Sequence, residues 1–128
     1  MNFGILGEAK IAREHVVPAI LNAGHKVTHV GRRIPGQVGL PEIYGNAIET
    51  DYETLINEPS VDAIYNPLPN HLHVPYSIEA LKADKHVLCE KPVALNLDEL
   101  SQLENAAKDS KAFFYEAFMV RSHPQWHW

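Results

Sequence analysis

Residues 2–12 read NFGILGEAKIA, and this stretch decides the predicted fold. Asn2–Leu6 has the apolar content of a short buried strand, and Gly7 breaks that run before helical spacing begins. A strand that turns through glycine directly into a helix gathers free backbone N–H groups at the positive end of the helix dipole. The stretch therefore predicts the first strand-turn-helix unit of a parallel sheet, with an anion-binding loop at the turn.

The same loop has the form of a dinucleotide-binding turn, in which a pyrophosphate lies against the backbone at the start of the helix. Gly7 would supply the tight turn and Ala12 the close packing of helix on sheet, while Ala9 replaces the glycine that usually lets the backbone approach a phosphate. The residues expected to contact the cofactor are Gly7, Glu8, Ala9, Lys10 and Ile11. The alternative is that Gly7 serves only the strand-to-helix turn.

A second indication follows the next expected strand, Lys26–Val30. Sites that prefer NAD usually place an acidic residue there, on the ribose hydroxyls, but this chain has Gly31, Arg32 and Arg33. A carboxylate at that position would repel a 2′-phosphate, but this position has no carboxylate. The two guanidinium groups therefore favour NADP over NAD as the cofactor. Two solvated surface arginines are the alternative.

Strand-like and helix-like segments alternate along the chain. The segments with strand content are Asn2–Leu6, Lys26–Val30, Ala47–Glu49, Val61–Tyr65, His86–Cys89 and Phe113–Glu116. Between them, apolar residues with helical spacing occupy residues 12–23, 52–56, 74–81 and 97–107. This alternation predicts a doubly wound, mostly parallel α/β sheet of about six strands with helices on both faces.

Two places depart from the regular alternation. Residues 34–41 hold two prolines and two glycines where a helix would be expected, which predicts a loop with one helical turn near Glu42. Pro18 interrupts the first helix and predicts a kink or a late helix start at that position.

Composition excludes several classes of partner. The 128 residues carry 11 basic and 16 acidic side chains, so the chain lacks the cationic surface that duplex nucleic acid or an anionic membrane requires. No apolar stretch approaches membrane-spanning length, and the single cysteine cannot form an intramolecular disulfide. These features favour a cytoplasmic protein that is stabilised by packing.

Three further segments carry a family resemblance. They are YNPLPNHLH at residues 65–73, HVLCEKP at residues 86–92 and EAFMVRSHPQW at residues 116–126. Together with the glycine loop they resemble the Gfo/Idh/MocA oxidoreductases over nearly the whole chain. The resemblance implies a Rossmann domain that binds NADP or NAD at residues 1–116, the start of an interdomain segment at residues 117–128, and an absent substrate domain. We therefore expect hydride transfer to a sugar, polyol or dihydrodiol as the reaction class, but no turnover by this chain alone.

The resemblance also implies roles for residues near the nicotinamide. Leu68 and Asn70 would lie against the nicotinamide ribose, and His73 would start the following helix, with capping or packing as its alternative role. Glu90 and Lys91 would end the fifth strand beside the nicotinamide. Lys91 is the candidate catalytic residue, because the corresponding family lysine orients the substrate oxygen and stabilises charge during hydride transfer.

Two more expectations come from the same segments. Pro92 resembles a proline whose peptide bond is often cis in the family, and Arg121 would reach the nicotinamide end of the cofactor. Val120 departs from the family, since many relatives carry an aromatic residue there.

Two other functions compete with this interpretation. A non-catalytic module that retains only the nucleotide-binding core would form a homo-oligomer through exposed apolar surface. A histidine metal site is suggested by His71 with His73 and by His123 with His127, but one cysteine and scattered imidazoles do not match the ligand spacing of structural zinc sites. We therefore expect no metal.

Overall fold

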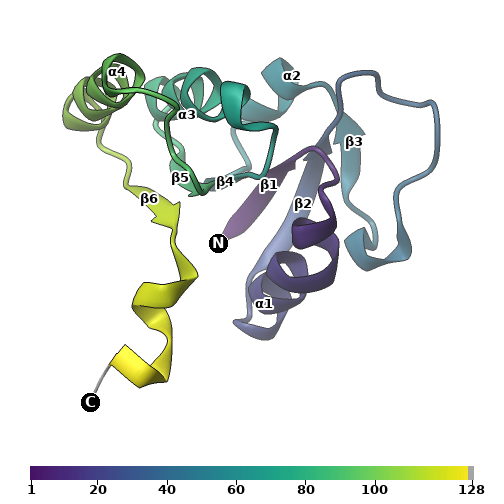
Figure 1. The fold of residues 1–128 in the computed structure, drawn as a ribbon. Helices are drawn as coiled ribbons and strands as arrows, with labels where there is room; N and C mark the ends of the chain where they lie inside the picture. The colour runs from purple at the N-terminus through teal and green to yellow at the C-terminus, as the bar shows by residue number, and fades with distance from the viewer. Residues whose placement is uncertain (127–128) are drawn as a thin grey trace.

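Six strands form one sheet in the order β3-β2-β1-β4-β5-β6, and every pairing between neighbours is parallel (Figure 1). The strands are β1 (Asn2–Leu6), β2 (Lys26–Gly31), β3 (Ile48–Thr50), β4 (Ala63–Asn66), β5 (His86–Glu90) and β6 (Phe114–Ala117). The computed structural model describes residues 1–126, so His127 of the second histidine pair lies outside the described residues. The strand order reverses between β1 and β4, which is the switch point at which doubly wound sheets bind ligands.

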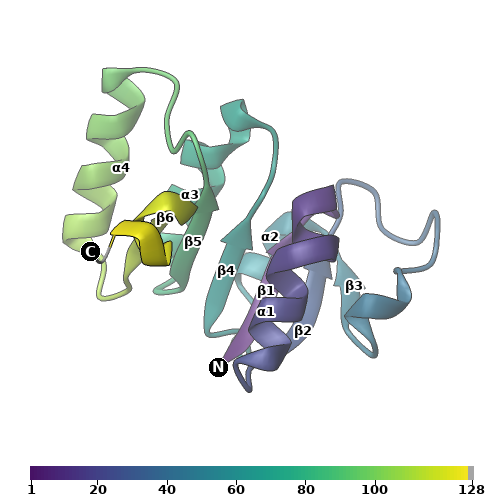
Figure 2. The same cartoon turned by 60° about the horizontal axis from the view of Figure 1, so that its bottom comes forward.

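Helices cover both faces of the sheet, as predicted (Figures 1 and 2). The longer helical segments are η1 (Ala12–Val16), α1 (Val17–Asn22), α2 (Tyr52–Ile56), α3 (His73–Lys82) and α4 (Leu97–Asp109). Short 3-10 turns occur at η2 (Glu42–Tyr44), η3 (Asn70–Leu72), η4 (Met119–Ser122) and η5 (Pro124–Trp126). No helix within residues 1–126 is long and apolar enough to cross a membrane.

The sheet separates two apolar cores. Alternate side chains of a strand point to opposite faces, so Ile5 packs toward α1 with Val17 and Val30, while Leu6 packs toward the other helices. The larger core joins Leu6 to side chains of α2, α3 and α4. Burial on both sides explains why the central strands read as apolar runs rather than as alternating patterns.

The two irregular segments behave as predicted. Residues 34–41 contain no helix, and the 3-10 turn η2 begins at Glu42. The first helix passes through the π turn η1 just before Pro18, where the Val17 N–H donates to the Ala12 carbonyl. Pro18 has no N–H of its own to donate, so the irregular turn falls where the ordinary helical pattern is interrupted.

Asn66, the last residue of β4, holds the turn between β4 and α3. Its side chain is fully buried, and its Oδ1 accepts a hydrogen bond from the Leu68 N–H at 3.2 Å. Its Nδ2 donates to the His73 carbonyl at 3.1 Å and to Ser77 Oγ at 3.3 Å. One amide thereby fixes the path of the chain from the sheet edge into the next helix.

We predict that Asn66→Ala lowers the free energy of unfolding by about 2–3 kcal/mol, because it leaves buried backbone groups without partners. Urea denaturation measures this change. In the control Asn57→Ala an exposed amide that donates only to the Glu53 carbonyl is removed, and the expected change is within about 0.5 kcal/mol. Equal losses of stability in the two variants would contradict the role of Asn66 in holding the turn between β4 and α3.

Candidate functional site

The candidate site lies beyond the carboxyl ends of the strands. Gly7 follows β1, Arg32 follows β2, Leu68 lies beyond β4 and Lys91 follows β5. Because all the strands are parallel, these four positions meet at one edge of the sheet. Topology thus brings together the two predicted halves of the site, although they are far apart in sequence.

The glycine loop leaves backbone donors free. Gly7 has a φ of +79°, and its N–H donates to the Gly31 carbonyl at 2.7 Å. The positive φ favours glycine, and a Cβ at Gly7 would lie 3.1 Å from Leu68 Cδ2, so the Leu68 side chain would have to shift to accept one. Within the described chain, the backbone N–H groups of residues 8–11 donate to no protein acceptor. Their position at the start of a helix fits the oxygens of a pyrophosphate.

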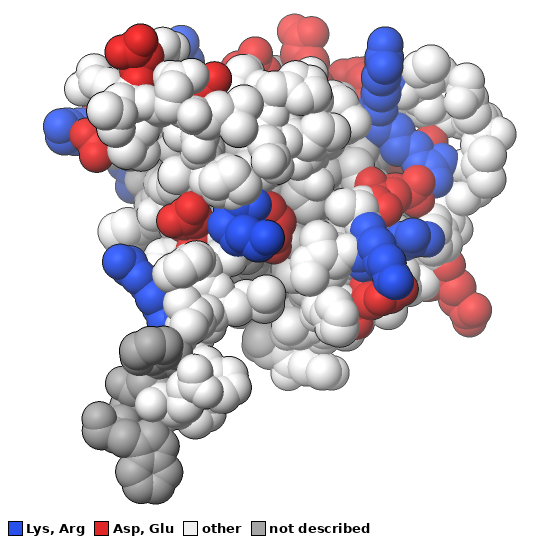
Figure 3. Space-filling model, in the orientation of Figure 1, with Lys and Arg blue, Asp and Glu red and all other residues white. Residues whose placement is uncertain are grey.

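The Arg32 side chain is already held by the protein. Its Nη1 donates to Glu49 Oε1 at 3.1 Å and to the Val38 carbonyl. Its Nη2 donates to Glu8 Oε2 and, at 3.4 Å, to the Gly39 carbonyl. Sequence reasoning considered only the end of β2 and so missed the acidic partners, which come from the glycine loop and from β3. Figure 3 shows acidic and basic side chains side by side in the right-hand part of this face.

Three polar atoms around this ion-pair cluster are buried without a hydrogen-bond partner: Glu8 Oε1, Arg32 Nε and the Tyr44 hydroxyl oxygen. Burial raises the pKa of Tyr44 to about 12, and the charge of Glu8 adds to that shift. Unpartnered buried polar atoms are uncommon in folded proteins and mark incomplete hydrogen bonding.

Arg33 differs from its neighbour because it is exposed, and its guanidinium forms no ion pair or hydrogen bond with any part of the chain that the structure describes. It lines two adjoining hollows together with Arg32 and Tyr52. The first, of about 420 Å³, also contains Gly7 and Glu8. The second, of about 750 Å³, extends to the loop after β4. Arg33, whose guanidinium has no partner in the described chain, therefore lines the same hollow as the glycine loop.

His73 joins the loops that follow β4 and β5. The ring is 1% exposed, its Nε2 lies 2.7 Å from the Leu68 carbonyl oxygen, and its Nδ1 lies 2.8 Å from the Pro92 carbonyl oxygen. A neutral imidazole donates to one of these oxygens, whereas an imidazolium donates to both. The bond between Lys91 and Pro92 is cis, which is the isomer often found in the family and which the sequence alone does not decide. The structure thus gives His73 a bridging and packing role.

Lys91 is exposed at the sheet edge and makes no hydrogen bond or ion pair within the described residues. Glu90, which could have compensated its charge, instead accepts a hydrogen bond from the Tyr65 hydroxyl at 2.8 Å. Burial raises the pKa of Tyr65, and the bond to Glu90 raises it further. The Lys91 ammonium is consequently available to a ligand.

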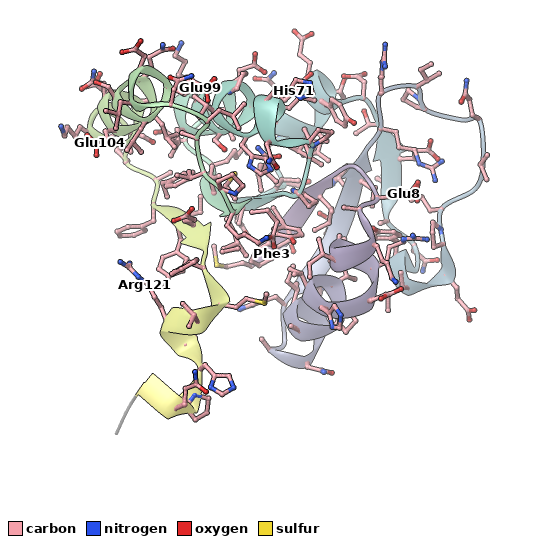
Figure 4. All side chains as sticks on the ribbon, viewed as in Figure 1. Phe3, Glu8, His71, Glu99, Glu104 and Arg121 are labelled. Carbon is pink, nitrogen blue, oxygen red and sulfur yellow. The ribbon has the colours of Figure 1, made fainter. Side chains whose placement is uncertain are left out.

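Three other predicted residues have exposed side chains: Asn70, Lys10 and Arg121. Asn70 is exposed at the start of η3. Lys10 is exposed at the start of the first helix, and its Nζ lies 3.8 Å from Glu14 Oε2. Arg121 lines a different hollow, between α4 and β6, together with Glu104 (Figure 4). The expected contact of Arg121 with the nicotinamide end of the cofactor stays a prediction. Among residues 1–126, no group of three His, Cys, Asp or Glu side chains is placed to hold a metal ion.

Comparison with known proteins gives one family. A family described as an oxidoreductase family with an NAD-binding Rossmann fold matches residues 1–118. An uncharacterized oxidoreductase of Rhizobium meliloti is 41% identical over 98% of this chain and 39% of its own length. The D-xylose 1-dehydrogenase (NADP(+)) 2 of Haloferax volcanii is 37% identical over 97% of this chain and 39% of its own length.

Solved structures agree with the sequence comparison. A 3-ketoreductase from Actinomadura kijaniata, crystallised with TDP-benzene and NADP, superposes with a TM-score of 0.90 at 32% identity. The match covers 99% of this chain and 41% of that protein. The chain thus spans about two fifths of the length of these relatives.

We predict that His73→Ala lowers the free energy of unfolding by about 2–3 kcal/mol, because the buried contact with the Leu68 carbonyl and the part-buried contact with the Pro92 carbonyl are lost. Denaturant unfolding measures the loss, and hydrogen exchange at the Val93 amide should accelerate as the loop after β5 loosens. His15→Ala, which removes an exposed ring on η1, is the control and should change neither quantity appreciably. Unchanged exchange at Val93 would contradict the bridging role.

Proposed function

The chain belongs to the Gfo/Idh/MocA oxidoreductase family and carries its NAD-binding Rossmann fold, and from this we propose that it binds NADP for hydride transfer to or from a sugar, polyol or dihydrodiol. One observation carries the proposal. The glycine loop, whose N–H groups at residues 8–11 have no protein acceptor within the described residues, contributes Gly7 and Glu8 to a hollow that Arg33 also lines. NADP requires an anion-binding helix start for its pyrophosphate and a second cationic group for its 2′-phosphate. A turn with only a structural role requires neither.

Each part of the cofactor has a proposed set of contacts. The pyrophosphate lies on the backbone of residues 7–11, and the 2′-phosphate lies against Arg33, with Arg32 behind it. NADP is favoured over NAD by the unpartnered guanidinium of Arg33 and by the relatives, of which one is named for NADP and another was solved with it. NAD remains a second ligand of the same groove.

We assign the nicotinamide half of the site to the loops after β4 and β5. Leu68 and Asn70 would flank the nicotinamide ribose. The bound nicotinamide would supply or accept the hydride. Lys91 is the proposed catalytic residue, since its exposed ammonium has no protein partner and would orient a substrate oxygen and stabilise negative charge on it.

The proposal includes a division of the chain. Residues 1–116 would form the cofactor domain, and residues 117–128 would begin the segment that leaves it. Sugar-related substrates are proposed from relatives named for D-xylose and for a dideoxyglucose derivative. A cytoplasmic location fits the single cysteine, Cys89, which is a buried free thiol.

A second candidate function, pairing with another copy of this chain, is favoured by one observation. Large apolar side chains are exposed just before β6, within it and in the turn after it: Phe113, Tyr115, Phe118 and Met119. Such a strip is typical of a surface that another surface covers. Cofactor binding does not depend on this pairing, and the two functions are compatible.

We predict that the chain binds NADPH more tightly than NADH in isothermal titration calorimetry. Arg33→Ala should weaken NADPH binding about tenfold, because a charge-assisted hydrogen bond to the phosphate is lost, and should leave NADH binding almost unchanged. Lys108→Ala removes a cation from α4, far from the groove, and is the control. Absence of binding by NADP, NADPH, NAD and NADH at millimolar concentration would refute the proposed function.

A further inference from the structure

We propose that Glu8 is a selectivity residue that opposes the 2′-phosphate of NADP and so limits the preference of this site for NADP over NAD. The inference rests on the proposed function. It gives a side chain of the glycine loop a role in cofactor selectivity, in addition to the binding of pyrophosphate by the loop backbone.

The guanidinium of Arg32 has almost no donor left for a ligand. An arginine carries five N–H donors. The two on Nη1 serve Glu49 and the Val38 carbonyl, and the two on Nη2 serve Glu8 and the Gly39 carbonyl. Only the Nε donor has no partner, and that atom is buried. A phosphate can bind Arg32 bidentately only if it displaces one of these acceptors.

The local charge also opposes a phosphate. Two carboxylates, Glu8 and Glu49, surround the single Arg32 guanidinium, and the Glu8 side chain lines the same hollow as Arg33. A 2′-phosphate would bring further negative charge beside Glu8, in a place where Arg32 is 12% exposed and solvent screening is weak. The 2′-hydroxyl of NAD carries no charge and meets no such repulsion.

Glu8, rather than Glu49, is the residue that can be changed without altering the surrounding loop. Glu49 Oε1 also accepts a hydrogen bond from the Gly36 N–H at 2.7 Å, and thereby anchors the loop of residues 34–41. Arg32 is the only donor to Glu8 within the described residues, and Glu8 Oε1 has no partner at all. Glu8 therefore makes few hydrogen bonds that support the fold, and its main contribution is a negative charge in the hollow.

The test compares NADPH and NADH binding to the unaltered chain, Glu8→Gln and Glu14→Gln by calorimetry. Glutamine keeps an oxygen that can accept from Arg32 but removes the charge. We expect the ratio of the NADH dissociation constant to the NADPH dissociation constant to rise about tenfold in Glu8→Gln, as loss of one like charge near the phosphate would give. Glu14→Gln removes a matched carboxylate from the exposed surface of η1 and should leave the ratio unchanged.

A purely structural ion pair predicts a different result. Loss of such a pair would lower the melting temperature of Glu8→Gln and weaken the binding of NADPH and NADH equally. An unchanged ratio of dissociation constants in a folded variant would therefore overturn this inference but leave the proposed function standing. Failure of the unaltered chain to bind any dinucleotide would overturn the proposed function and this inference with it. If Glu8→Gln does not fold, Glu8→Ala, which also removes the charge, carries the same expectation and the same refuting result.

Discussion

The turn at Gly7 is the constraint on which the rest of the site depends. Its positive φ lets β1 end and the first helix begin within a tight turn, and a Cβ at this position would lie only 3.1 Å from Leu68 Cδ2 in the loop after β4. The Gly7 N–H is bonded to the Gly31 carbonyl of the neighbouring strand, which fixes the turn against β2 as well. A side chain here would strain the backbone of the turn and press on the Leu68 side chain.

From this turn the site divides into two halves held by different forces. At the loops after β4 and β5, where we propose the nicotinamide to bind, contacts run from Leu68 through His73 to Pro92 and support the loop that carries Lys91. At the end of β2, where we propose the adenosine half to bind, charged groups dominate, with Arg32 held between Glu8 and Glu49. Buried hydrogen bonds position groups rigidly, whereas ion pairs beside a groove respond to an incoming charge. For this reason we place the proposed selectivity role at the end of β2.

Much of the architecture could be predicted from the sequence because it depends on local patterns. Apolar runs gave all six strands to within two residues at either end, and the proline and glycine content of residues 34–41 correctly indicated a loop. The ion-pair cluster could not be found this way, since Glu8 and Glu49 reach Arg32 only after β1, β2 and β3 have aligned side by side. The amide of Asn66 was also missed as a support, because its partners become visible only once α3 packs against β4.

We propose that the glycine loop and the end of β2 form one dinucleotide-binding surface. An amide-resolved NMR titration with NADPH tests this proposal. We expect the largest chemical-shift changes at the backbone amides of residues 8–11 and of Arg32 and Arg33. Changes confined to other surfaces, such as α4 or the exposed side of β6, would contradict it, as would saturating NADPH that leaves the loop amides unmoved.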